Sequence, residues 1–222
     1  NADIEERICG ADVVWVGGGS VANLLALWRL HGVDEAMRAA WEGGTILGGV
    51  SAGAICWHIG GTTDSFGPTL RPVTDGLGFL PYGCGVHYDS EEQRRPLLHE
   101  LVGAGTLPTS YATDDGVGIL YEGTEPVEVI TDRPDRLASA YRIQATPEGV
   151  VEARRRAWQR GVARDEGAAA GEAELQEEEL VEAEAAVRGA GALVEGGDGL
   201  DGEVGGGAVQ RGEGLALRRQ PH

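Results

Sequence analysis

Short apolar runs alternate with glycine turns and amphipathic stretches over the first part of the chain. Residues 12–16 (DVVWV) and 45–50 (TILGGV) have the pattern of buried strands, and three glycines follow the first of them at once. Residues 21–32 (VANLLALWRLHG) carry leucines and a tryptophan on one stripe, which predicts a helix that Ser20 caps and a glycine ends. A second helix, capped by the preceding aspartate, is expected over 35–44. This order of strand, glycine turn, helix and strand is typical of a parallel, doubly wound α/β sheet.

Weaker patterns follow in the middle of the chain. Residues 85–89 (GVHYD) look like the end of another strand. Ser90 with Gln93 forms a capping box for the helix that follows, and Pro96 must distort or delay that helix. Four short β-rich segments, separated by turns, predict closing antiparallel strands over 109–113, 116–123, 126–130 and 138–143.

The composition changes near Thr146. Beyond this residue the chain contains no Ser, Thr, Asn, Ile, Phe or Tyr, and it consists mostly of Gly, Ala, Glu, Arg, Leu and Val. We therefore divide the chain into an α/β domain over 1–146 and a low-complexity tail over 147–222, which we expect to be largely disordered. Residues 175–191 have the composition of a helix, and an acidic interaction tail is the functional alternative. We assign no chemistry to this part.

Net charge and cysteine content narrow the class of partner. The 222 residues carry a formal net charge of −18, which argues against a nucleic-acid partner. No apolar run approaches the roughly 18 residues of a membrane span, so we expect no membrane partner. The three cysteines show no C-x-x-C pair, which suggests a reducing, cytoplasmic setting. The chain starts at Asn1 and leads quickly into a strand, so we interpret it as a fragment.

One serine lies in the frame G-x-S-x-G, formed by Gly49, Ser51 and Gly53. A strand is predicted before Ser51 and a helix after it, which is the context of a nucleophile elbow. The amide of Ala52, at the helix start, can face a developing oxyanion, and the glycine loop 17–19 can supply a second donor. The alternative is that Ser51 only caps a helix after a buried strand.

A nucleophilic serine needs a base and an orienting acid. The candidate bases are His31, His58, His87 and His99. His87 is favoured because it lies near a strand end, whereas His58 would point along the elbow helix and away from the serine. The candidate acids are Asp64, Asp89, Glu91, Asp114 and Asp115, and spacing alone does not choose among them.

Two other kinds of site are weaker hypotheses. Gly17-x-Gly19-x-x-Ala22 after a strand is similar to a dinucleotide fingerprint, but the acid expected about 20 residues later is missing. Cys84-x-x-His87 is half of a zinc site without a second pair, so we expect no metal.

Six segments, taken in order, resemble the dipeptidase E and cyanophycinase family of serine peptidases: VWVGGGSVANLL, GGVSAGAICW, TTDSFGP, DGLGFLP, VHYDSEEQRRP and DDGVGILYEG. The resemblance covers roughly residues 10 to 143 and implies a flavodoxin-like fold related to class I glutamine amidotransferases. It implies that Ser51 is the nucleophile, that His87 is the base and that Asp64, after a Thr-Thr pair, is the acid. It further implies an oxyanion donor at Gly18 or Gly19 and a reaction that needs no cofactor.

Two departures from the family pattern affect the expected substrate and assembly. Strand–helix units that precede the glycine loop in the family are absent, so we expect an N-terminally truncated sheet with an exposed edge and a tendency to form homo-oligomers. Glu91 stands about where dipeptidase E has an arginine for the substrate aspartate, and Arg94 and Arg95 are the nearby substitutes. The expected substrate is a short peptide. The enzyme is expected to cleave Asp-X dipeptides or to accept a broader range of residues. The alternative substrate is the β-aspartyl-arginine unit of cyanophycin.

Overall fold

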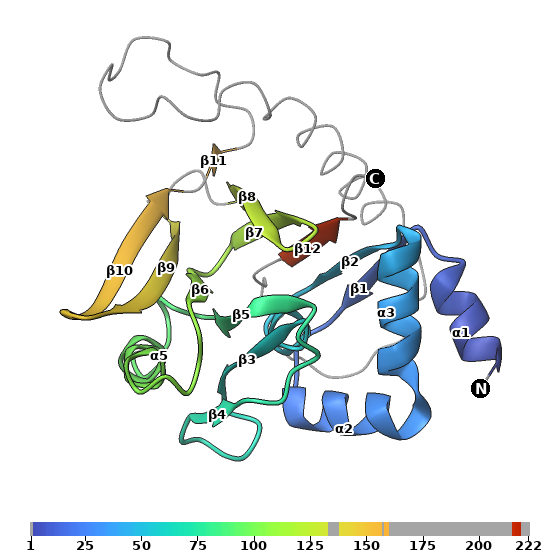
Figure 1. Cartoon of the computed structure of the whole chain (residues 1–222), viewed down its shortest axis with the longest axis horizontal. Helices are drawn as coiled ribbons and strands as arrows, with labels where there is room; N and C mark the ends of the chain where they lie inside the picture. Colours follow the sequence, from blue (N-terminus) through green and yellow to red (C-terminus); the bar gives the residue numbers. More distant parts are fainter. Residues whose placement is uncertain (1, 133–137, 157, 160–214, 219–222) are drawn as a thin grey trace, which may run out of the picture. The chain divides into compact units, whose positions relative to one another are not determined.

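The computed structural model describes residues 2–132, 138–156, 158–159 and 215–218 (Figure 1). These residues form a mixed α/β structure with two six-stranded sheets. The expected helix over 175–191, and most of the expected tail, lie outside the described residues. Within the described part, no helix is both long enough and apolar enough to cross a membrane.

The first sheet carries the two strands predicted around the glycine loop. Its strand order is β1-β2-β12-β7-β8-β11. The bounds are Val13–Val16 for β1, Ile46–Gly49 for β2, Val117–Glu122 for β7, Glu125–Thr131 for β8, Trp158–Gln159 for β11 and Leu215–Arg218 for β12. Strands β1 and β2 are parallel, with Val16 opposite Gly49, so the loop after β1 and the serine after β2 leave the sheet side by side.

The second sheet has the order β10-β9-β6-β5-β3-β4. The bounds are His58–Thr63 for β3, Arg71–Val73 for β4, Leu80–Gly85 for β5, Ser110–Thr113 for β6, Ser139–Thr146 for β9 and Gly149–Arg156 for β10. Strands β3, β5 and β6 are parallel, and β4, β9 and β10 join antiparallel. Parallel pairing is therefore confirmed, but the parallel strands are divided between two mixed sheets. Strand β6, which was expected among the antiparallel strands, pairs in parallel with β5 and antiparallel with β9.

Five helices accompany the strands in the described residues. They are α1 (Ala2–Cys9), α2 (Val21–His31), α3 (Val33–Gly43), α4 (Ala52–Ile55) and α5 (Arg94–Gly103). The expected cap of α2 is confirmed, because the Ser20 hydroxyl accepts a hydrogen bond from the Asn23 amide at 3.3 Å. Gly32 then ends the helix with φ 70°, a conformation that glycine adopts without strain.

Three helix starts differ from the prediction. Helix α1 was not expected, because the residues before β1 were interpreted as a lead into a strand. Helix α3 has Gly32 at its N-cap, so Asp34 lies in its first turn instead of capping it. Helix α5 begins only at Arg94 and has no side-chain cap, so Ser90 and Gln93 form no capping box. The delay assigned to Pro96 fits this start, since proline is tolerated in a first turn.

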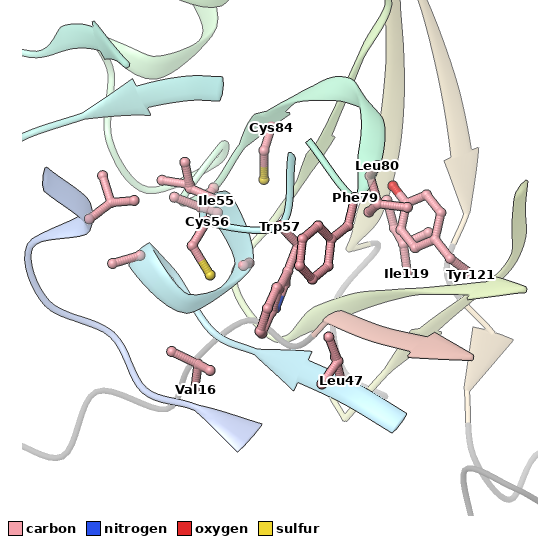
Figure 2. Close-up of a cluster of buried hydrophobic side chains, with 14 of the residues drawn as sticks. Val16, Leu47, Ile55, Cys56, Trp57, Phe79, Leu80, Cys84, Ile119 and Tyr121 are labelled. Carbon is pink, nitrogen blue, oxygen red and sulfur yellow. The ribbon is translucent and has the colours of Figure 1, made fainter. Parts of the chain in front are cut away.

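A short helix and a buried tryptophan fix the chain after Ser51. Helix α4 has a single turn, and the chain enters β3 at His58, where a longer helix was expected. Trp57 at this junction is fully buried. Its ring lies 5.6 Å from that of Phe79 and 5.7 Å from that of Trp28, and Figure 2 shows Leu47 and Ile55 in the same cluster. Helix α4 therefore packs against the buried hydrophobic core.

The predicted boundary at Thr146 lies inside a β-hairpin. Strand β10 pairs with β9 along its whole length, from Gly149 opposite Thr146 to Arg156 opposite Ser139. The ordered structure thus continues beyond the position where the composition changes. The segment was missed because its sequence, GVVEARRR, shares the residue types of the tail while its register is set by the preceding strand.

The two glycines around Ser51 lie where backbones come into close contact. A Cβ atom on Gly53 would lie 2.2 Å from the carbonyl oxygen of Val16, at the end of β1. A Cβ atom on Gly49 would lie 2.2 Å from the carbonyl oxygen of Gly53. The atoms in the way are backbone atoms, which cannot rotate aside, so both positions require glycine.

Replacing Gly53 with alanine should therefore destabilise the fold. We expect Gly53→Ala to lower the free energy of unfolding by roughly 3 kcal/mol, as overpacking in a close-packed region does. Gly43→Ala is the matched control, because a Cβ atom at the end of α3 meets no atom within 4 Å. Urea denaturation of both variants tests this, and an equal effect of the two substitutions would contradict it.

Candidate active site

Ser51 occupies a sharp turn between β2 and α4. Its backbone has φ 53° and ψ −115°, which places a side chain other than glycine in a strained region. Among the described non-glycine residues, Ser51 and His87 are the two with positive φ. A helix N-cap residue ordinarily has extended backbone, and the Ser51 side chain makes no capping hydrogen bond. The conformation therefore fits a nucleophile elbow and not a simple cap.

The structure brings Ser51 and His87 together, as the sequence predicts. His87 Nε2 lies 3.1 Å from Ser51 Oγ, within hydrogen-bonding distance. His87 follows the carboxyl end of β5, and its side chain is 15% exposed. The side chain is thus largely shielded from solvent by protein. The serine hydroxyl can donate to Nε2 when the opposite nitrogen carries the ring proton.

Asp115, and not Asp64, is the carboxylate at the other nitrogen of His87. Asp115 Oδ1 lies 2.9 Å from His87 Nδ1. Asp64 is exposed in the turn after β3, where its carbonyl accepts a hydrogen bond from the Gly67 amide at 3.0 Å. The structure therefore places Asp115, and not the expected Asp64, against the imidazole. Asp115 was among the alternatives that sequence spacing left open.

Strand order explains why Asp115 reaches the imidazole. Strands β5 and β6 are parallel neighbours, and the contact continues past the end of β5 through a hydrogen bond from the Tyr88 amide to the carbonyl of Thr113, the last residue of β6, at 3.1 Å. Asp89 adds to this junction, because its Oδ1 accepts a hydrogen bond from the Asp115 amide at 2.8 Å. The end of β3 instead turns toward α2, where Ser65 Oγ accepts from the Ala22 amide at 3.4 Å.

Two other candidate acids have structural partners. Asp114 is buried, and its Oδ2 accepts hydrogen bonds from the Ser139 amide at 3.0 Å and the Tyr141 hydroxyl at 3.2 Å. Burial raises the pKa of the Asp114 carboxyl, and the hydrogen bond from Ser139 opposes this shift. Glu91 forms an ion pair with Arg94 at 2.7 Å. Neither carboxylate faces His87 in a described contact.

The glycine loop after β1 lies against the serine. A Cβ atom on Gly18 would lie 3.5 Å from Ser51 Cβ and 4.0 Å from Ser51 Oγ. A hydrogen bond of 3.0 Å from the Val50 amide to the Val16 carbonyl holds the two strand ends together. Ala52 is the first residue of α4, where a helix leaves its amides without intrahelical acceptors. Gly18 and Ala52 are therefore both immediate neighbours of Ser51.

The other candidate histidines lie elsewhere. His58 is fully buried at the start of β3, where Nδ1 lies 2.9 Å from the Ala54 carbonyl oxygen. Burial lowers the pKa of His58 to about 4, so its ring is neutral at pH 7 and donates that hydrogen bond. His31 is exposed at the end of α2, and His99 on α5 contacts Glu152 at 2.8 Å. None of these rings has a described contact with Ser51.

The guanidinium groups of Arg94 and Arg95 contact other parts of the protein. Arg94 is buried and donates hydrogen bonds to Glu91 and to the Thr62 carbonyl. Arg95 forms an ion pair with Glu152, and its guanidinium carbon lies 4.3 Å from the centre of the Tyr88 ring. A substrate carboxylate would have to compete with these partners, so a role of either arginine in substrate binding stays a prediction.

The cysteines and acidic residues assemble no evident metal centre in the described part of the chain. No group of three or more His, Cys, Asp or Glu side chains there could hold a metal ion. Cys56 and Cys84 are buried free thiols, and Cys9 is an exposed one. Burial raises the pKa of the Cys56 thiol well above its ordinary value, so this group is protonated at pH 7.

Comparison with known proteins agrees with the geometry. The sequence model of peptidase family S51 matches residues 1–129, which is more than half of the chain. The chain belongs to peptidase family S51. The resemblance to the dipeptidase E family that the sequence motifs indicate is confirmed at this level.

Curated relatives carry peptidase names. The uncharacterized peptidase YgaJ of Bacillus subtilis (strain 168) is 38% identical over 152 residues, which cover 68% of this chain and 64% of the relative. Peptidase E of Actinobacillus pleuropneumoniae serotype 5b is 29% identical over 126 residues, which cover 52% of this chain and 53% of the relative. The chain thus spans between about half and two thirds of the length of these relatives. No solved structure matches it.

Proposed function

We propose that this S51-family chain carries the catalytic centre of a serine-type exopeptidase that hydrolyses short peptides. The observation that carries the proposal is the continuous hydrogen-bonded series Ser51 Oγ, His87 Nε2, His87 Nδ1 and Asp115 Oδ1, with distances of 3.1 Å and 2.9 Å. A nucleophile, a base in contact with it and an acid that orients the base are the parts that acyl transfer by a serine requires.

In the proposed mechanism, Ser51 Oγ attacks the scissile carbonyl carbon while His87 Nε2 takes the hydroxyl proton. His87 then returns this proton to the leaving amine, which departs as the acyl-enzyme forms. Water, deprotonated by the same nitrogen, hydrolyses the ester and frees Ser51. Asp115 stays ionised, accepts the hydrogen bond from Nδ1 and holds the ring in the tautomer that leaves Nε2 as the proton acceptor.

The oxyanion formed by this attack needs donors on the far side of the carbonyl. We assign them to the Ala52 amide and to an amide of the glycine loop, at Gly18 or Gly19. The proximity of Gly18 to Ser51 supports the assignment, because a Cβ atom on Gly18 would lie only 3.5 Å from Ser51 Cβ, so the backbone of the glycine loop runs beside the serine. The step needs no cofactor, since the protein supplies the nucleophile, the base and the donors.

Substitution of the three side chains tests the mechanism. In the full-length protein, Ser51→Ala and His87→Ala should each lower kcat by roughly a thousandfold or more, as loss of one member of such a unit does. Asp115→Asn should lower it by a factor on the order of a thousand, because the amide favours the wrong tautomer of His87. Dipeptide hydrolysis followed by release of the free amino acid measures these effects.

Asp64→Asn is the matched control for the acid. It removes the same charge from an exposed carboxylate at a neighbouring strand end, and it should change kcat less than about threefold. A large loss in Asp64→Asn with normal activity in Asp115→Asn would contradict the assignment of the acid. Near-normal activity of Ser51→Ala would contradict the whole mechanism.

The proposed substrate is a short peptide whose preferred side chain is not restricted to aspartate. Recognition of a carboxylate in a partly buried pocket needs a matched cation. Both nearby arginines have carboxylate partners in this structure: Arg94 pairs with Glu91, and Arg95 pairs with Glu152. Their contacts favour a broader preference over strict Asp-X specificity, with hydrolysis of β-aspartyl-arginine units as a second candidate within the same mechanism.

A panel of X-Leu dipeptides, together with β-aspartyl-arginine, measures this preference. We expect kcat/KM for Asp-Leu to lie within about tenfold of the value for uncharged X-Leu substrates, because Arg94 and Arg95 would each have to leave an ion pair to bind the aspartate. A strong preference for Asp-Leu that is lost in Arg95→Ala would contradict this expectation and restore the arginine to the substrate site.

The proposal also includes the setting and assembly of the protein. A doubly wound, flavodoxin-like arrangement is supported by the parallel β1–β2 and β3–β5–β6 sets. A cytoplasmic location is supported by the free thiols of Cys9, Cys56 and Cys84. Formation of homo-oligomers is supported by β1, which lies at the edge of its sheet and carries Trp15, 55% exposed.

A further inference from the structure

The β9–β10 hairpin contacts the chain directly beside both partners of Ser51. Tyr88, the residue after His87, donates a hydrogen bond from its hydroxyl to Glu152 Oε2 at 2.8 Å. Asp114, the residue before Asp115, is paired with Ser139, since each backbone amide donates to an oxygen of the other residue at 3.0 to 3.1 Å. Glu152 lies on β10 and Ser139 on β9.

Glu152 contacts three side chains that all belong to the segment after His87. Besides Tyr88, it binds Arg95 in an ion pair and His99 Nε2 at 2.8 Å. Arg95 lies over the rings of Tyr88 and Tyr141, at 4.3 Å and 4.7 Å from their centres. Burial alone raises the pKa of Glu152, but the hydrogen bonds from His99 and Tyr88 and the Arg95 charge lower it below its ordinary value. The carboxylate is therefore ionised at pH 7.

His87 needs such support because its backbone is strained. Its φ of 54° is unfavourable for a residue with a side chain, and a strained conformation persists only where its surroundings fix it. Tyr88 is 3% exposed, so its side chain is fixed by core contacts as well as by the hydrogen bond to Glu152. Loss of that hydrogen bond would leave a buried hydroxyl without its acceptor and free the neighbouring peptide to relax.

We infer that Glu152 is a positioning residue that aligns His87 with Ser51 through Tyr88, and that the β9–β10 hairpin is part of the catalytic apparatus. The hairpin fixes the base through Tyr88 and the acid through Asp114, although it lies beyond the residues that the family model matches. The inference rests on the proposed function, since it concerns the alignment of the same serine and histidine.

The rate at which a fluorophosphonate probe labels Ser51 tests this role in the full chain. The rate constant of labelling reports the alignment of Ser51 with His87, whereas the final labelled fraction reports how much of the protein is folded. We expect Glu152→Ala and Tyr88→Phe each to lower the rate constant about tenfold while the final labelled fraction stays close to that of the wild type. Glu148→Ala, at an exposed position in the turn of the same hairpin, should label at the wild-type rate.

A double variant separates positioning from an independent effect. If Glu152 acts through Tyr88, the variant carrying both Tyr88→Phe and Glu152→Ala should label no more slowly than Glu152→Ala alone, because both changes remove one interaction. The inference would be overturned if the double variant lost as much labelling rate as the two single losses multiplied together. It would also be overturned if both single variants labelled at the wild-type rate. Either result would leave the proposed function intact. Absence of Ser51 labelling in the wild-type chain would overturn both. Tyr88→Phe, which removes a single oxygen atom, keeps the test decisive if Glu152→Ala does not fold.

Discussion

The backbones of β1 and α4 lie so close together that no side chain fits at positions 49 and 53, and the placement of Ser51 depends on this contact. The carbonyl oxygen of Val16 occupies the space that a Cβ atom on Gly53 would need. The chain must therefore turn sharply after β2, and Ser51 takes up the strain with a φ of 53°. The same contact sets Gly18 against the serine, so Ser51 and its nearest candidate oxyanion donors are placed by one constraint.

The partners of the serine depend on a second feature, the parallel pairing of β5 and β6. This pairing aligns the carboxyl ends of the two strands. As a result, His87 Nδ1 lies 2.9 Å from Asp115 Oδ1, and the Tyr88 amide donates a hydrogen bond to the Thr113 carbonyl. Two strained residues thus face each other from different sheets. A strained backbone persists only where the surrounding structure is rigid. The buried cluster around Trp57 supports Ser51, and the β9–β10 hairpin supports His87.

The parts of the site that could be predicted are those encoded locally. The Ser51 turn was recognisable because strand, glycine frame and helix follow one another within a few residues, and His87 was recognisable as a strand-end residue with the family spacing. Asp115 was left among five acids, and the resemblance implied Asp64 instead, because the contact of Asp115 with His87 depends on which strands are neighbours. Sequence order does not state that β6 lies beside β5 while the end of β3 turns toward α2.

The same reason explains the missed hairpin and the assignment of the arginines. Strand β10 has no strong pattern of its own and is defined by its register with β9, so its composition resembled that of the tail. Arg94 and Arg95 are close to His87 in sequence, but α5 starts late and directs one of them to Thr62 and the other to Glu152. Long-range partners decide the role of such residues, and a single sequence does not contain them.

In the proposed catalytic site, the Nδ1–H group of His87 donates a hydrogen bond to Asp115, and Nε2 accepts a hydrogen bond from the Ser51 hydroxyl. Nitrogen NMR of the protein labelled at the histidine ring nitrogens, assigned by a His87→Gln variant, measures this directly at a pH where the ring is neutral. The proposed mechanism predicts a protonated Nδ1 and an unprotonated Nε2, with an Nδ1 signal that moves in Asp115→Asn and stays in place in Asp64→Asn. A proton on Nε2, or an Nδ1 signal that responds only to Asp64→Asn, would contradict the proposed alignment of Ser51, His87 and Asp115.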